Sequence, residues 1–141
     1  MKPPILFIDD ESFFSRPYIL ELKERFEVIN YKSAQSGLQG VTAHPNARLL
    51  ILDIMMPSPA GVAATATNQG LETGIWLLDR IRSEVISRPL PVFVLTNAGH
   101  AKVKRALADV SIPARLIEIH AKIETPKFVL PSLVQALLDK V

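Results

Sequence analysis

The sequence predicts an α/β protein with an open, doubly wound sheet of five parallel strands, and three observations support this prediction. Five short runs are rich in Val, Ile, Leu and Phe. Three of these runs are apolar without alternation, which is typical of strands that are buried on both faces of a parallel sheet. Segments with a helical period separate the runs, and regular alternation of strand and helix favours right-handed crossovers.

The five predicted strands are short and recur along the whole chain. They cover residues 5–8, 26–31, 49–52, 92–95 and 115–120. The runs ILFI, LLIL and VFVL are the continuously apolar ones. We therefore expect helices on both faces of these three strands.

Three segments have a clear helical period. The clearest, 71–85, carries an apolar stripe at steps of four and three, formed by Leu71, Ile75, Leu78, Ile81 and Val85. Segments 100–110 and 131–141 repeat this pattern, with Val103, Leu107, Val110, Leu133, Leu137 and Val141 predicted to face inward. One side of each helix should therefore pack on the sheet.

Two further helices, at 15–26 and 33–44, have weaker patterns. Pro17 interrupts the first and two glycines interrupt the second. Since proline removes a helical hydrogen bond, Pro17 predicts that the first helix begins, or kinks, well after the acidic residues 9–11.

The segment 58–70 does not fit the alternation of strands and helices. It has no charged residue and consists of small side chains and turn-forming residues. It is too long for an ordinary loop, so we interpret it as either a functional elaboration or a mobile flap.

Length and composition limit the class of protein. The 141 residues suit a single domain, and the formal charge of +2 is too small to favour nucleic acid as a partner. The chain has no cysteine, which excludes disulfides and thiolate chemistry. The N-terminal apolar run is far too short for a signal peptide or a membrane span. We expect a cytoplasmic protein that does not bind a membrane.

Polar residues follow four of the predicted strands. They are Asp9, Asp10 and Glu11 after the first strand, Asp53 after the third, Thr96 after the fourth and Lys122 after the fifth. In open α/β sheets the carboxyl ends of parallel strands hold the ligand site, most often where the strand order reverses. If the first and third strands are neighbours, their acids converge at that edge.

Crowded carboxylates raise one another's pKa values unless a cation keeps them ionised. Mg²⁺ is suited to this role because it prefers oxygen ligands and one or two carboxylates. We expect Asp10 and Asp53 to bind Mg²⁺ directly, and Asp9 to act through water or by orienting a ligand. The alternative is a solvated helix N-terminus, and this interpretation suits Glu11 best.

A magnesium site with a lysine and a hydroxyl at its rim is suited to a phosphoryl group. Lys122 supplies a compact charge for phosphate oxygens, and Thr96 can donate one hydrogen bond. The chain has no cysteine and no recognisable serine–histidine pair, so the nucleophile has to be a carboxylate. Asp53 is the candidate because it stands alone at its strand end.

The fragments FIDDE, LILDIMMP and VLTNAG, together with Lys122, resemble the receiver domain of two-component response regulators over essentially the whole chain. The resemblance implies a flavodoxin-like fold with strand order 2-1-3-4-5. It also implies that a histidine kinase or phosphotransfer protein phosphorylates Asp53, with Mg²⁺ bound by Asp10, Asp53 and the backbone carbonyl of Met55. Thr96 would then turn toward the phosphoryl group, and the output would be contact with a downstream protein.

The sequence departs from the family pattern at several positions, among them Asn97, which is bulkier than the small residue common after the threonine. The glycine expected shortly after the Met-Pro pair corresponds to Gly74, which makes 58–70 an insertion near the site. Ile123 follows Lys122 where the family has proline, and Ile119 stands at the position of an aromatic switch residue. These departures predict ordinary phosphoryl chemistry with an unusual output.

We therefore expect a stand-alone receiver, a phosphoacceptor rather than an enzyme, acting as a monomer or weak dimer. The chain would equally suit one domain of a longer protein. A receiver fold that binds partners without phosphorylation is the first alternative. A magnesium-dependent phosphohydrolase of the haloacid dehalogenase kind is the weaker one, because Glu11 and Ser12 stand where its second aspartate belongs.

Overall fold

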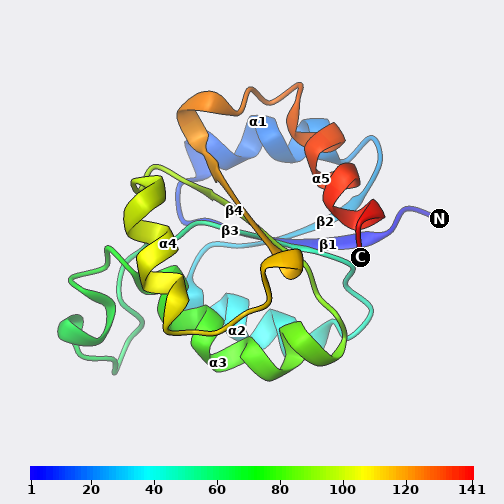
Figure 1. The fold of residues 1–141 in the computed structure, drawn as a ribbon. Coiled ribbons are helices and arrows are strands. Elements are labelled where there is room, and N and C mark those ends of the chain that lie inside the picture. Colours follow the sequence, from blue (N-terminus) through cyan, green and yellow to red (C-terminus); the bar gives the residue numbers. More distant parts are fainter.

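The five apolar runs form one parallel sheet between two layers of helices in the computed structural model, which describes residues 1–141 (Figure 1). The strands are β1 (Pro4–Ile8), β2 (Glu27–Tyr31), β3 (Leu50–Leu52), β4 (Val92–Thr96) and β5 (Ile117–Ala121). The helices are α1 (Ser12–Leu22), α2 (Ala34–Ala43), α3 (Thr73–Ser87), α4 (His100–Ala108) and α5 (Leu130–Asp139). The order across the sheet is β2-β1-β3-β4-β5, which confirms the predicted fold class and strand order.

Side chains alternate along each strand and so build two separate cores. In β1, Leu6 and Ile8 pack with residues of α2, α3 and α4, whereas Ile5 and Phe7 pack with residues of α1 and α5. Figure 1 shows α1 and α5 on one side of the sheet and α2 and α3 on the other. The three central strands β1, β3 and β4 are almost completely buried, because helices cover both of their faces. This burial explains why their sequences are apolar without alternation.

The prediction that α1 begins well after the acidic residues is wrong, and its alternative, a kink caused by Pro17, stays a prediction. The helix begins at Ser12, directly after Glu11, and contains Pro17. Proline leaves the carbonyl four residues earlier, that of Phe13, without its helical donor. Phe13 is exposed, so water can hydrate this carbonyl, and the helix forms although its sequence includes a proline.

The apolar stripes predicted for α3 and α5 each include one terminal residue that does not face the core. Leu71 precedes α3 and is 52 % exposed, and Val141 follows α5 and is 48 % exposed. In α5 the buried residues include Val134 and Leu137, while Leu133 is only partly buried. Each stripe therefore continues only as far as its helix.

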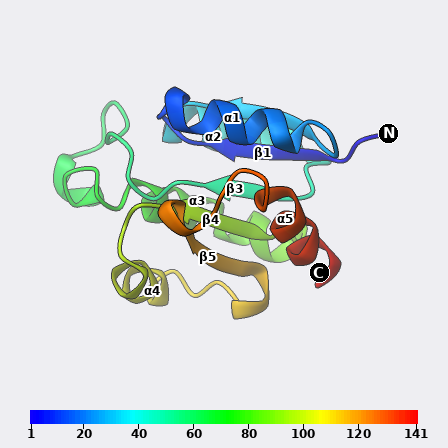
Figure 2. The same cartoon turned by 90° about the horizontal axis from the view of Figure 1, so that it is seen from above.

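The segment 58–70, which we call the flap, extends from the carboxyl edge of the sheet, at the opposite end from both chain termini (Figure 2). It contains one short 3₁₀ helix, Ala64–Thr67. Two further 3₁₀ turns, Ala114–Leu116 and Lys122–Glu124, precede and follow β5. No helix combines the length and the apolar character that a membrane crossing requires.

Candidate functional site

The carboxyl edge of the sheet brings the predicted acids together. Asp9 and Asp10 follow β1, and Asp53 follows the neighbouring strand β3. Carboxylate oxygens of these three residues and of Glu11 all lie within 4.8 Å of one another. Asp9 and Asp53 are buried, and Asp10 is partly exposed.

Lys122 lies at the centre of the acidic group. Its Nζ is 3.0 Å from Asp9 Oδ2, 3.0 Å from Asp53 Oδ2 and 3.1 Å from Glu11 Oε1. The lysine directly follows β5, and its side chain is only 3 % exposed. The Phe14 ring covers the ammonium group, with its centroid 4.2 Å from Nζ. One buried cation thus joins the ends of β1, β3 and β5.

One lysine does not balance four carboxylates. Burial, and next the charge of Asp53, raise the pKa of Asp9 to about 6. Burial also raises the pKa of Asp10. Burial lowers the pKa of Lys122, but the charges of Asp53 and Asp9 outweigh this effect and the net shift is upward. The acidic group therefore carries negative charge that Lys122 does not balance and that a further cation could neutralise.

The donor atoms present fit a hard divalent cation. Asp10 Oδ1 is buried and accepts no hydrogen bond, so it is an oxygen without a partner beside Asp53. The surrounding donors are carboxylate and carbonyl oxygens, which are the ligands that Mg²⁺ prefers. An unpaired buried carboxylate oxygen is unfavourable, and a bound cation would remove that cost.

The base of the flap fixes the peptide that carries the predicted carbonyl ligand. The Met56 N–H donates to the Gly70 carbonyl at 3.2 Å. A trans peptide is planar, with its C=O and N–H on opposite sides, so the Met55 carbonyl points away from Gly70. Thr73 Oγ1 donates to the Met56 carbonyl at 2.5 Å and holds the next peptide as well. The Met55 N–H donates to Asp53 Oδ1 at 3.3 Å.

Gly74 allows the first turn of α3 to pack on the end of β3. A Cβ at this position would lie 2.6 Å from the Asp53 carbonyl oxygen and 2.7 Å from Ile54 Cα. The Gly74 N–H donates to the Ile54 carbonyl at 2.9 Å. The glycine therefore sets how closely α3 approaches the candidate nucleophile.

Thr96 is fully buried at the end of β4, and its Oγ1 accepts the Ala98 N–H at 3.2 Å. Strand pairing places Thr96 opposite Ala121, the residue before Lys122. In β5, Ile119 packs against the core on the α4 side, and His120 stacks on Phe93 on the other face with ring centroids 4.2 Å apart. The part that Thr96 plays in phosphoryl chemistry stays a prediction.

Thr67 organises the flap and carried no signal in the sequence. It is fully buried, and its Oγ1 accepts the Gly70 N–H at 3.2 Å and pairs with the Ser58 hydroxyl. The Thr67 carbonyl accepts the Glu72 N–H at 2.8 Å. Sequence reasoning also missed the contact of Glu11 with Lys122, because an acid next to a helix start is usually explained by the helix dipole.

No protein-family model matches the chain, and no curated protein matches it in sequence. Solved structures do match. The receiver domain of a Francisella response regulator is 18% identical, with a TM-score of 0.69 over 99% of this chain and 98% of that one. A response regulator receiver domain protein from Methanospirillum hungatei is 19% identical, with a TM-score of 0.66 over 99% and 97%. The BeF3-activated receiver domain of DrrB is 16% identical, with a TM-score of 0.70 over 99% of both chains. The chain therefore has the fold of response-regulator receiver domains.

Proposed function

We propose that the chain is a phosphoacceptor of a two-component phosphorelay and that Asp53 receives the phosphoryl group from a histidine kinase or a phosphotransfer protein. The observation that carries the proposal is the position of Lys122, whose Nζ lies 3.0 Å from both Asp53 Oδ2 and Asp9 Oδ2. A buried ammonium shared by two carboxylates can contact the oxygens of a phosphoryl group on one of them.

The chemistry needs one nucleophile and several stabilising groups. An Asp53 carboxylate oxygen forms a bond to phosphorus while the bond from phosphorus to the donor imidazole nitrogen breaks, and the imidazole leaves with a proton from solvent. Lys122 already contacts Asp53, so it can follow the charge that develops on the transferred oxygens. Thr96 would donate its hydroxyl hydrogen to another of these oxygens.

Asp10, Asp53 and the Met55 carbonyl would hold Mg²⁺, and Asp9 would contact it through water. The bound ion would neutralise charge on the phosphoryl oxygens. The unpaired Asp10 Oδ1 and the raised pKa values of Asp9 and Asp10 support this assignment.

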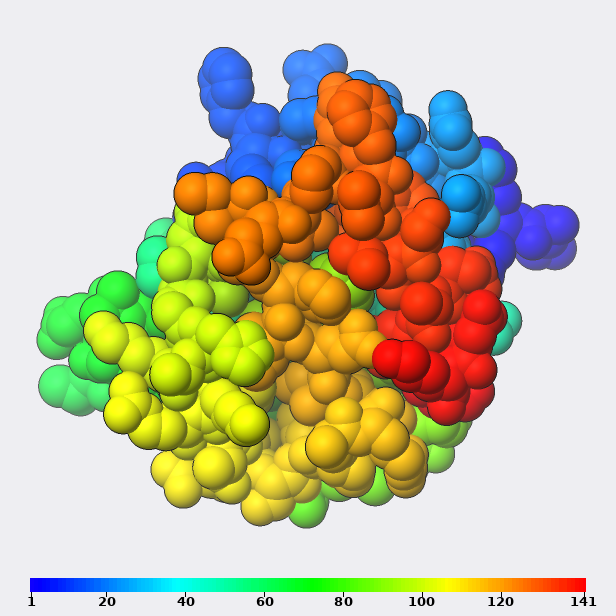
Figure 3. Space-filling model, turned by 45° about the horizontal axis from the view of Figure 1, so that its top comes forward, coloured from blue at the N-terminus to red at the C-terminus, as the bar shows by residue number.

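A surface for the phosphodonor protein lies beside the acids. Phe13 at the start of α1 is fully exposed, Ile123 is 90 % exposed and Phe128 is 71 % exposed. The segment after β5, orange in Figure 3, lies on the surface next to the blue N-terminal part that includes α1. Exposed apolar side chains on both sides of a reactive group suit a protein partner. Output would pass to a downstream protein through α4, β5 and α5.

Intact-mass spectrometry after incubation with acetyl phosphate and Mg²⁺ tests the proposal. We expect one added phosphoryl group, which is lost in alkali, and none on the Asp53→Asn variant. Asp79→Asn is the matched control because Asp79 is an exposed aspartate on α3 outside the acidic group. Rapid turnover of acetyl phosphate without an adduct would favour the hydrolase. No reaction at all would favour a receiver fold that binds partners without phosphorylation.

A further inference from the structure

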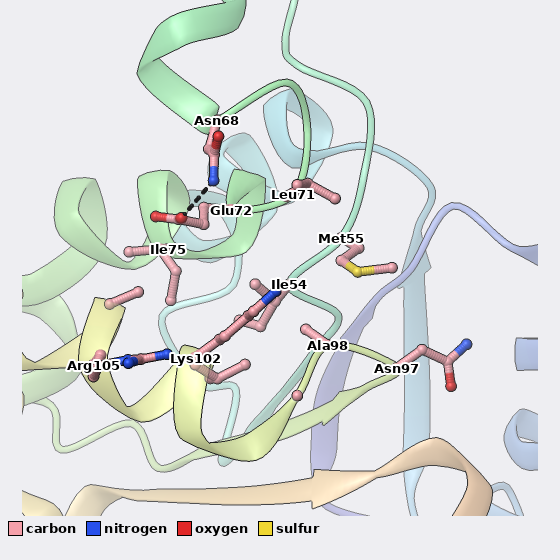
Figure 4. Close-up of a pocket in the computed structure, with 13 residues that line it drawn as sticks. Ile54, Met55, Asn68, Leu71, Glu72, Ile75, Asn97, Ala98, Lys102 and Arg105 are labelled. Atoms are coloured by element: carbon pink, nitrogen blue, oxygen red, sulfur yellow. Dashed lines mark hydrogen bonds between the residues drawn. The ribbon is translucent and has the colours of Figure 1, made fainter.

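A cavity lies beside the acidic group but does not include it. This pocket, of about 600 Å³, is bounded by the base of the flap, the start of α3 and α4 (Figure 4). Its volume is in the range of sites for small organic molecules. No residue of the acidic group lines it, nor does Thr96 or Lys122.

The pocket combines an apolar surface with groups of opposite charge on its two sides. Ile54, Ile75 and Val103 contribute apolar surface between the end of β3, α3 and α4. Lys102 and Arg105 project from α4, and Glu72 lies across from them at the base of the flap (Figure 4). Leu71, which a helix stripe would have buried, is instead exposed at the pocket wall.

The charged groups are not paired with one another. Neither Lys102 nor Arg105 has a carboxylate within ion-pair distance anywhere in the protein, although both line the same pocket as Glu72. Glu72 Oε2 accepts a hydrogen bond from Asn68 Nδ2 at 3.0 Å. Two unpaired cations against one carboxylate give the pocket a positive excess. No carboxylate of the protein pairs with Lys102 or Arg105, so a bound anion could take that place.

We propose that this pocket binds a small organic anion with an apolar body, such as an aromatic carboxylate. Its anionic group would lie between Lys102 and Arg105, and its apolar part would contact Ile54, Ile75 and Val103. The ligand needs both an anionic group and an apolar body, because surface cations alone bind small anions weakly in water.

The pocket also borders the phosphoryl site through the backbone. Met55, two residues after Asp53, and Asn97 and Ala98, directly after Thr96, all line it. A bound anion would contact these same loops, and any effect of the anion on them would be matched by an equal effect of the site on anion binding. The binding itself does not depend on the proposed function.

An NMR titration of the full chain tests the proposal, with naphthoate as the probe and the neutral naphthalenemethanol as its matched control. We expect saturable shifts of the amides of Leu71, Ile75, Val103 and Ala106, and a dissociation constant for naphthalenemethanol at least about tenfold higher. The double variant Lys102→Ala/Arg105→Ala should weaken naphthoate binding by a similar factor. Lys104→Ala, on the same helix but outside the pocket, should not.

Ala106→Trp would fill the pocket, so it should abolish the shifts without changing the thermal unfolding midpoint by more than a few degrees. Asp53→Asn should still bind naphthoate saturably, which separates this result from the outcome of the phosphorylation experiment. Equal affinity of the two probes, shifts spread over the surface, or unchanged binding in the double variant would each overturn the proposal.

Discussion

The acidic group and the flap lie next to each other at the same edge of the sheet, yet different forces hold them. Charge dominates the first, where one lysine contacts three carboxylates at 3.0 to 3.1 Å. The flap has no charged residue, and hydroxyl and backbone hydrogen bonds around Thr67 and Gly70 organise it. The two regions should therefore respond differently to charge removal, to backbone strain and to pH.

Removal of the central charge should have the largest effect. Lys122→Met leaves Asp9 and Asp53 buried without their counter-ion, and we expect the free energy of unfolding in EDTA to fall by about 3 to 5 kcal/mol. Urea unfolding measures this value, and saturating Mg²⁺ should restore part of it.

Lys104→Met is the control for this variant, because Lys104 is exposed and forms no ion pair. A loss for Lys122→Met no larger than that of the control would show that the acids do not need the lysine.

Substitution of two glycines in the flap should distinguish the cost of backbone strain from an effect on the acidic group. Gly61 and Gly70 have φ values of 81° and 86°, but only Gly70 would place a Cβ 2.9 Å from the Met56 carbonyl oxygen. Gly61→Ala should cost about 1 kcal/mol from strain, and Gly70→Ala about 2 kcal/mol.

Only Gly70→Ala should also weaken Mg²⁺ binding, measured by isothermal titration calorimetry, because it displaces the Met56 carbonyl and with it the adjoining peptide, which carries the Met55 carbonyl. If both variants bound Mg²⁺ like the original chain, the flap would not position this carbonyl.

The response to pH should distinguish the two regions. Asp9 takes up a proton more readily in the folded protein than in the unfolded chain, because its pKa is raised from 3.8 to about 6. In EDTA, lowering the pH from about 8 to about 5 should therefore add about 1.5 kcal/mol of stability through this group. Parallel urea titrations of the Asp9→Asn variant should lack this gain. Protection of flap amides, once corrected for intrinsic exchange, should change little, since the flap has no charged side chain.

The smallest expected effect is local to the flap. Thr67→Val keeps the shape but removes the oxygen that accepts the Gly70 N–H, at a cost of about 1 kcal/mol. Hydrogen exchange measured by mass spectrometry should show faster exchange across the flap and unchanged exchange in the central strands. Thr65→Val, at an exposed position of the same 3₁₀ helix, provides the comparison. Unfolding of the whole protein by Thr67→Val would contradict the local role.

The sheet and the acidic group could be predicted because their sequence signals are strong. A run such as LLIL has no polar face, so it has to lie between two layers, and Asp53 directly after it has to lie at the sheet edge. The position of Lys122 at this edge followed from its place at a strand end rather than from any local pattern, whereas its direct contact with Asp53 was not predicted. The roles of these residues in phosphoryl transfer remain predictions.

The errors arose where tertiary contacts override local preference. Pro17 disfavours a helix locally, but the packing of Tyr18 and Leu22 against the core keeps α1 intact around it. Leu71 continues a helical stripe in sequence, yet the flap ends just before it and the chain turns away. The interior of the flap depends on one threonine among several small polar residues, and no periodic pattern identifies it.

The C-terminal end of the flap is held at Met56, whose N–H donates to the Gly70 carbonyl, and the flap itself begins only two residues after Met56. The chain thus leaves and re-enters the domain at nearly the same point. The intervening residues could be shortened, or exchanged for a foreign peptide, with little strain passed to the strand ends. Met56 therefore marks a natural splice point, at which a receiver fold can acquire a new recognition loop without rebuilding its reactive edge.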